Sequence, residues 1–146
     1  MTKLVQAFLT GIFFTFILDF FIFLGIKLHY IDYYEIAVYY NILFADHQNI
    51  YIFLAISTVL GYIVTYVNNT KLSIITIGTL CIIVSLTLLE TIGNKVGEII
   101  LMDKNTTLYS KKYTYDGDIY YNGRKKITFY DYKLKKIILL NKKELK

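Results

Sequence analysis

One carboxylate inside a long apolar run is the residue whose type and position most suggest chemistry. Asp19 lies eight residues before Lys27, where this run ends, which is about 12 Å inside the run if it is helical. An ionised carboxylate within a bilayer costs several kcal/mol, so such a residue is usually paired, neutral or functional. Two hypotheses follow: Asp19 fixes helix packing and orients the docking of a partner, or it handles protons or cations.

Hydroxyl groups are the hydrogen-bond partners that we expect for Asp19. Counting the same depth into the antiparallel second run reaches Thr58, and counting back from the end of the third run reaches the neighbourhood of Thr87. Thr15 precedes Asp19 by one helical turn. The predicted intramembrane set is therefore Asp19 with Thr15, Thr58 and Thr87. A transport pathway normally needs more than one intramembrane ionisable group. The only other one in these runs, Glu90, lies near the membrane surface, so packing or docking is the preferred role.

A second polar group is expected at the membrane surface where the first run ends. Its members are Lys27, His29, Asp32, Glu35 and Glu90. Glu90 belongs here because the first and third runs cross the membrane in the same direction. The histidines of this region and the nearby carboxylates are residue types that bind metals, but their spacing matches no standard ligand pattern. We therefore predict polar groups at the water boundary and no metal site.

Signatures of catalytic and cofactor sites are absent from the sequence. It contains no G-x-S-x-G motif, no Walker-type lysine loop and no dinucleotide-binding glycine pattern. The single cysteine, Cys81, excludes a disulfide within the chain. Tyrosine interleaved with lysine suits single-strand nucleic-acid binding, but the tyrosines are also what strands require. The sequence therefore predicts a non-catalytic protein with no cofactor and no nucleic-acid partner.

Three long apolar runs must position these side chains, at about residues 4–27, 50–67 and 72–92. Roughly 20 apolar residues cross a hydrocarbon core of about 30 Å as a helix. The second and third runs are separated only by a short polar stretch, which is typical of antiparallel neighbours. The predicted fold is an α-helical integral membrane protein with three transmembrane helices.

Small and hydroxylated residues form a seam on each expected span. In the first span they recur every fourth position, at Ala7, Gly11, Thr15 and Asp19. The seams of the other two spans are Thr58, Gly61, Tyr62 and Thr65, and Thr76, Thr79, Thr87 and Glu90. Such residues let membrane helices approach closely and hydrogen-bond across the contact. We expect these seams to pack against one another or against another membrane protein, including a second copy.

The segment between the first two spans is too polar to cross a membrane and too apolar to be a solvated loop. Asp32 and Glu35 have the spacing of a capping box, and tyrosines cluster around them, as is typical of the membrane interface. We therefore predict a short interfacial helix over about residues 33–45.

The last part of the chain differs in composition. Residues 1–94 carry three basic and five acidic residues, whereas residues 95–146 carry thirteen basic and six acidic ones. Asp116-Gly117 and Asn122-Gly123 are hairpin signals, and Ile127 and Phe129 alternate with polar residues as in a strand. We predict a small antiparallel β meander or barrel-like appendage over 95–146, with four or five strands.

The basic residues of this appendage are lysines apart from Arg124. A site for bidentate recognition of carboxylate or phosphate would favour arginine, so a solvated lysine surface is the simplest interpretation. Contact with anionic lipid is the alternative, because a basic surface beside a bilayer is attracted by its potential.

Together, 146 residues with 55% hydrophobic residues and a net charge of +5 indicate a multi-pass membrane protein. We expect an accessory or assembly subunit that docks partners through its seams. The alternative is a small ion- or proton-conducting oligomer centred on Asp19. The expected location is a bacterial inner membrane, with the basic appendage on the cytoplasmic side as the positive-inside rule favours.

Overall fold

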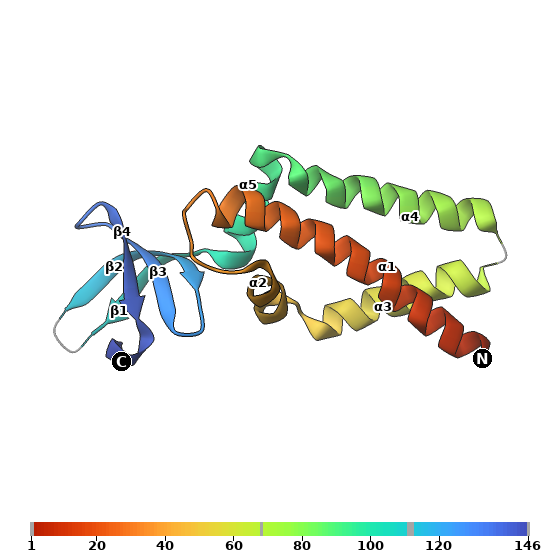
Figure 1. The fold of residues 1–146 in the computed structure, drawn as a ribbon, viewed down its shortest axis with the longest axis horizontal. Helices are drawn as coiled ribbons and strands as arrows, with labels where there is room; N and C mark the ends of the chain where they lie inside the picture. The colour runs from red at the N-terminus through yellow and green to blue at the C-terminus, as the bar shows by residue number, and fades with distance from the viewer. Residues whose placement is uncertain (1, 68, 111–112, 146) are drawn as a thin grey trace.

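The protein consists of a helical bundle with a small β-sheet at one end (Figure 1). The computed structural model describes residues 2–67, 69–110 and 113–145. In chain order the elements are α1 (Lys3–Ile26), the π-helical turn η1 (Lys27–Ile31), α2 (Tyr40–His47), α3 (Ile50–Tyr66), α4 (Thr70–Ser85), the 3₁₀ turn η2 (Leu86–Leu88), α5 (Glu90–Leu101), β1 (Asp103–Tyr109), β2 (Thr114–Asn122), β3 (Lys126–Asp131), β4 (Lys136–Asn141) and the 3₁₀ turn η3 (Lys142–Glu144). The predicted combination of apolar helices with an antiparallel sheet is confirmed.

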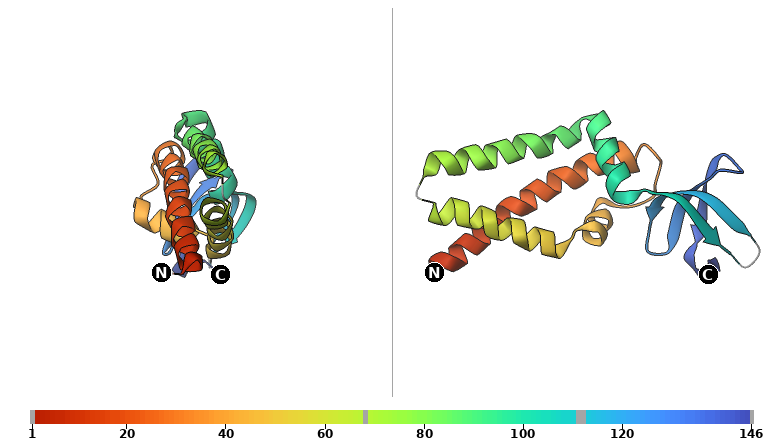
Figure 2. Two further views of the ribbon diagram at one scale, coloured as in Figure 1. Left: turned by 90° about the vertical axis from the view of Figure 1, so that its right-hand side faces the viewer. Right: turned by 180° about the vertical axis from the view of Figure 1, so that it is seen from behind.

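Two helices in the described part of the chain are long and apolar enough to cross a membrane by themselves, Lys3–Ile31 and Thr70–Leu88. A third span exists if α2 and α3, which meet at an angle of 85°, are counted as one broken helix. The N-terminus and the α3–α4 connection lie at one end of the bundle, and α2, α5 and the sheet lie at the other (Figure 2). A membrane location fits these helices.

Asparagine side chains mark the beginnings of α3 and α4. The side-chain oxygen of Asn49 accepts hydrogen bonds from the backbone N–H groups of Tyr51 and Ile52, at 3.0 and 3.2 Å. Asn69 accepts one from Leu72 at 3.2 Å. N-cap bonds of this kind satisfy donors that have no partner inside a helix, and they explain why both helices begin where they do.

The seam expected on the first span packs against α3. A Cβ atom added to Gly11 would lie 1.8 Å from the carbonyl oxygen of Ser57, and one added to Gly61 would lie 2.1 Å from that of Ala7. The two backbones are therefore in direct contact, as small residues allow. Of the seam expected on α3, Gly61 is in this contact, whereas Thr58 and Tyr62 are exposed.

The third apolar run does not form one helix over 72–92. The helix α4 ends at Ser85, and Leu89 is extended before α5 begins. The Thr87 hydroxyl donates to the carbonyl oxygens of Val84, at 2.7 Å, and Phe21, at 3.1 Å. A threonine that bonds to the preceding turn disturbs a helix, and here the bond to Phe21 also fastens the end of the run to α1.

The sheet begins later than residue 95, because Glu90–Leu101 is the helix α5. Its buried residues Gly93, Gly97 and Leu101 recur every fourth position, which is a helical period. A Cβ atom on Gly97 would lie 2.4 Å from that of Tyr30. The absence of a side chain at this position therefore lets α5 lie against the end of the first helix.

The short helix predicted over 33–45 begins later in the chain and is α2 (Tyr40–His47). The first helix continues through η1 to Ile31, so Asp32 follows a helix instead of preceding one. Glu35 then has a φ of 52°, in the left-handed region, and the chain reverses there. The capping box was therefore a wrong prediction, since its two residues lie in a turn.

The sheet is antiparallel with the strand order β1-β2-β3-β4. Asn122-Gly123 lies at the connection between β2 and β3, as expected, but Asp116-Gly117 lies inside β2. A Cβ atom on Gly117 would lie 1.8 Å from the carbonyl oxygen of Tyr130. This glycine therefore permits a close approach of two strands and does not form a turn.

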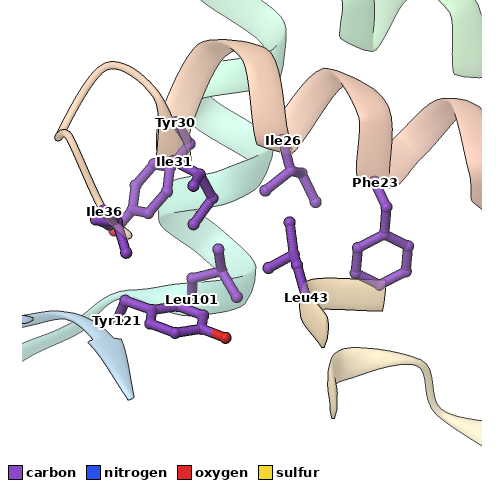
Figure 3. Close-up of a cluster of buried hydrophobic side chains, with 8 residues drawn as sticks. All are labelled: Phe23, Ile26, Tyr30, Ile31, Ile36, Leu43, Leu101 and Tyr121. Atoms are coloured by element: carbon purple, nitrogen blue, oxygen red, sulfur yellow. The ribbon is translucent and has the colours of Figure 1, made fainter. Parts of the chain in front are cut away.

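The two faces of the sheet have different neighbours. One face buries Ile119, Ile127 and Phe129 in a core of its own. A bulge between Ile119 and Tyr121 shifts the register, and β-bulges re-aim side chains. Tyr121 consequently packs in a cluster with residues of the helices, as Figure 3 shows. The members of this junction core are Phe23, Ile26, Tyr30, Ile31, Ile36, Leu43, Leu101 and Tyr121.

Replacement of Gly61 by alanine should destabilise the protein by about 1–3 kcal/mol, because the added methyl group forces α3 away from Ala7. Gly78→Ala is the matched control, since nothing lies within 4 Å of a Cβ atom there. The free energy of unfolding can be measured by circular dichroism during denaturation in mixed micelles. Equal values for the two variants would show that the α1–α3 contact does not govern stability.

Candidate functional site at the junction of bundle and sheet

Asp19 is hydrogen-bonded to an amide, not to a hydroxyl. Its Oδ2 accepts from Nε2 of Gln48 at 2.8 Å. Gln48 follows the last residue of α2, and α3 begins two residues later. The carboxylate therefore lies level with the first turn of α3 and not with its middle. This places Asp19 nearer to the sheet end of the bundle than counting along the first span predicted.

The three threonines expected around Asp19 have other surroundings. Thr58 is exposed and donates to a carbonyl oxygen of its own helix at 2.8 Å. Thr87 bonds to Phe21 and Val84 as described above. Thr15 is 1% exposed, and its hydroxyl has no hydrogen-bond partner among the described residues. The predicted intramembrane set is therefore not assembled around the carboxylate.

Three of the five polar residues expected at the membrane surface take part in two separate contacts, and the other two are exposed. Lys27 forms an ion pair with Asp32 at the end of η1. His29 contacts the carbonyl oxygen of Leu88 through Nε2 at 2.8 Å; since a carbonyl only accepts, Nε2 carries the proton. Glu35 and Glu90 are exposed.

Asn94 completes the attachment of His29, because its side-chain amide donates to the His29 carbonyl oxygen at 2.9 Å. His29 thus links the end of the first helix to both η2 and α5. Glu90 stands in the first turn of α5, where the helix dipole favours an acidic side chain. These residues fix the position of α5, and they do not converge on one point.

The short helix α2 connects the bundle to the sheet. Two residues before Gln48, the Asp46 carboxylate accepts two hydrogen bonds from Arg124, one from Nε to Oδ2 at 2.8 Å and one from Nη2 to Oδ1. His47 stands between Asp46 and Gln48 in the sequence, and the centroid of its ring lies 5.5 Å from that of the Tyr121 ring. Sequence reasoning identified Arg124 as the only arginine but not its partner. Arginine is the residue type that favours a bidentate contact, and here its partner is a carboxylate of the same chain and not an external ligand.

Arg124 also alters the acidity of its partner. The hydrogen bond from the guanidinium holds the pKa of Asp46 below its usual range, and the same bond raises the pKa of Arg124. A carboxylate with a lowered pKa in the folded state stabilises that state above its unfolded pKa. The stabilisation is lost as the pH falls through the lower, folded value.

A continuous series of tyrosine rings runs from the end of the first helix onto the sheet. Neighbouring ring centroids lie between 4.4 and 6.2 Å apart. The series comprises Tyr33, Tyr30, Tyr34, Tyr120, Tyr130 and Tyr132. Edge-on and stacked aromatic pairs contribute about 0.5–1.5 kcal/mol each beyond the area they bury, so this series stabilises the attachment of the sheet.

Hydrogen bonds fix both ends of this series. The Tyr30 hydroxyl donates to the backbone oxygen of Tyr120 at 2.9 Å, and the Tyr132 hydroxyl donates to Asn105 Oδ1 at 3.1 Å. Burial raises the pKa of Tyr120 to about 12, so this phenol stays neutral at physiological pH. The arrangement is suited to packing.

No group of three or more His, Cys, Asp or Glu side chains is placed to hold a metal ion in residues 2–67, 69–110 and 113–145. Comparison of the chain with models of protein families, with curated proteins and with solved structures gives no significant match.

Replacement of Asp19 by alanine should destabilise the folded protein by about 1–3 kcal/mol, because it leaves the partly buried Gln48 amide without its acceptor. Asp19→Asn keeps an acceptor oxygen and should cost less. Unfolding in mixed micelles measures both. If alanine and asparagine are equally tolerated and both abolish an ion flux, the conduction hypothesis is favoured over packing.

Arg124→Gln should raise the pKa of Asp46 toward its usual range, because the guanidinium hydrogen bond that lowers it is lost, and carbon NMR of the carboxyl group measures this. It should also accelerate hydrogen exchange in α2 and at the β2–β3 connection, because the ion pair between them is lost. Lys143→Gln removes the same charge from an exposed site and serves as the control. Unchanged exchange in both variants would contradict a connecting role for α2.

Proposed function

We propose that the protein is a non-catalytic accessory or assembly subunit that docks a transmembrane helix of another membrane protein between α3 and α4. The observation that supports this role is a cleft of about 610 Å³ between these helices. The proposal includes a bacterial inner membrane and a cytoplasmic sheet, since the basic residues are concentrated after residue 94.

The cleft exists because α3 packs mainly on α1, whereas α4 approaches α1 only near its own C-terminal end (Figure 1). The two helices diverge although α3 ends at Tyr66 and α4 begins at Thr70. The residues that line the cleft are Phe14, Val64, Thr65, Val67, Asn69, Thr70, Ser73, Ile74, Ile77 and Gly78.

The lining suits a helix better than lipid chains. Gly78 has nothing within 4 Å of where its Cβ would be, so a second backbone can approach it closely. Thr65 and Thr70 add hydroxyls, and such groups hydrogen-bond across helix contacts in membranes. Acyl chains gain nothing from either feature. In contrast, the large aliphatic and aromatic side chains elsewhere on the bundle surface suit lipid.

Asp19 has an indirect part in this proposal. Its hydrogen bond with Gln48 fixes the corner at which α3 begins, and the direction of α3 determines one wall of the cleft. The carboxylate is thus a positioning residue for docking. Ion or proton conduction centred on Asp19 remains a prediction from the sequence.

Photo-crosslinking tests the docking site. A photoreactive amino acid at Ile74, which lines the cleft and is 66% exposed, should form a covalent adduct with one other membrane protein in cells. The matched control is Ile82, which is 68% exposed and does not line the cleft. Gly78→Leu should abolish the adduct at Ile74, because it fills the space left at that position.

The mass of the adduct distinguishes a second protein from a second copy of this chain. Adducts of equal yield from Ile74 and Ile82, or adducts with lipid alone, would contradict docking in the cleft. A homodimer adduct from Ile74 with pH-dependent conductance would instead support the conducting oligomer.

A further inference from the structure

A groove of about 520 Å³ lies where the bundle meets the sheet. One side is formed by the segment that leads into α2, and the other by the β2–β3 connection and the adjoining strands. The lining residues that carry the argument are Ala37, Tyr39, Tyr121, Lys125, Lys126 and Leu139. The groove is separate from the cleft between α3 and α4, with which it shares no residue.

The groove combines exposed apolar surface with basic side chains. Tyr39 and Leu139 are 78% and 59% exposed, so apolar surface remains uncovered there. Lys125 and Lys126 also line the groove, and no acidic residue is among those that line it in the described chain. Arg124 also lines it, but its guanidinium is bound to Asp46. The two lysines therefore supply the positive charge for a ligand.

The position of the groove indicates the class of ligand. It borders α2, which lies at 85° to α3, and a helix bent in this way at the end of a bundle suits the surface of a bilayer. Exposed tyrosine is typical of this level of a membrane. Lipid head groups and the first carbons of their chains lie at the same level, and they combine charge with apolar surface as the groove does.

We propose that this groove binds one anionic glycerophospholipid. Its phosphate lies between Lys125 and Lys126, and an acyl chain lies along Tyr39 and Leu139. A free phosphate would contact only the two lysines, whereas a phospholipid would contact the lysines and the apolar surface. This site does not depend on docking between α3 and α4.

Fluorescence quenching tests the site in the whole protein. The chain contains no tryptophan, so Tyr39→Trp introduces a single reporter at the groove. The protein is reconstituted into phosphatidylcholine vesicles in which increasing fractions are replaced by dibrominated phosphatidylglycerol or dibrominated phosphatidylcholine. Bromine quenches only nearby tryptophan. The phosphatidylglycerol should quench at a lower fraction than the phosphatidylcholine.

Variants separate the contribution of the lysines from that of the apolar surface. In the reporter background, Lys125→Gln with Lys126→Gln should reduce the preference for phosphatidylglycerol by up to about 25-fold, from about fivefold for each lysine at an anionic surface. The control pair Lys136→Gln and Lys143→Gln removes equal charge from the same domain outside the groove and should keep the preference. Leu139→Gln should weaken quenching by both lipids, unlike Leu134→Gln, which is similarly exposed.

Several outcomes would overturn the proposal. Equal quenching by the two lipids means that no anionic site exists near Tyr39. An equal loss of preference in both lysine pairs means that only the overall charge attracts the lipid. If inorganic phosphate removes the preference and Leu139→Gln has no effect, the groove binds an anion and not a phospholipid. The crosslinking result at Ile74 is unaffected by any of these outcomes.

Discussion

Close approach to the first helix at glycine positions is the constraint on which the rest of the structure depends. Three later segments meet this helix where a side chain is missing: the backbone of α3 at Gly11, the backbone of η2 at Gly25, and α5 with its own Gly97 against the Tyr30 side chain. At Gly25 an added Cβ atom would lie 2.3 Å from the carbonyl oxygen of Thr87. Packing and interhelical hydrogen bonds, more than the hydrophobic effect, associate helices within lipid. Close approach at these points therefore determines where each later helix lies.

The length of this helix explains how one element can serve both the bundle and the sheet. Lys3–Ile31 comprises 29 residues, which is about 43 Å of helix at about 1.5 Å per residue. A hydrocarbon core is about 30 Å thick. The last turns therefore extend beyond the level at which α3 begins, and their residues Ile26, Tyr30 and Ile31 form the centre of the junction core. The sheet packs against the continuation of this apolar helix.

The apolar helices and the antiparallel sheet could be predicted because they follow from local patterns. A long apolar run and the alternation of Ile127 and Phe129 depend only on neighbours in sequence. The early end of the third run could not be predicted, because Thr87 is fastened to Phe21 across the bundle. Gly117 was wrongly placed in a turn, because glycine is found both in tight turns and where two strands approach closely. Only the register of β2 and β3 distinguishes them.

The candidate site was predicted less well than the fold, for a physical reason. Counting depth along the first span assumed straight antiparallel helices, whereas the sharp angle between α2 and α3 brings Gln48 to Asp19. An available signal was the spacing of Gly93 and Gly97, which is that of a close helix contact. Another was the isolated arginine among lysines. The sequence does not reveal which carboxylate that arginine meets, since Asp46 is 78 residues away.

The glycine contacts of the first helix also determine an order of assembly. Chains are synthesised from the N-terminus, and the parts made first fold first. The helix at Lys3–Ile31 leaves the ribosome before Ser57, Thr87 and Gly97, the residues that meet it later. Each of these three segments consequently meets a helix that has already been synthesised. The sheet arrives last, and the tyrosines that receive it are by then held at the end of a completed bundle.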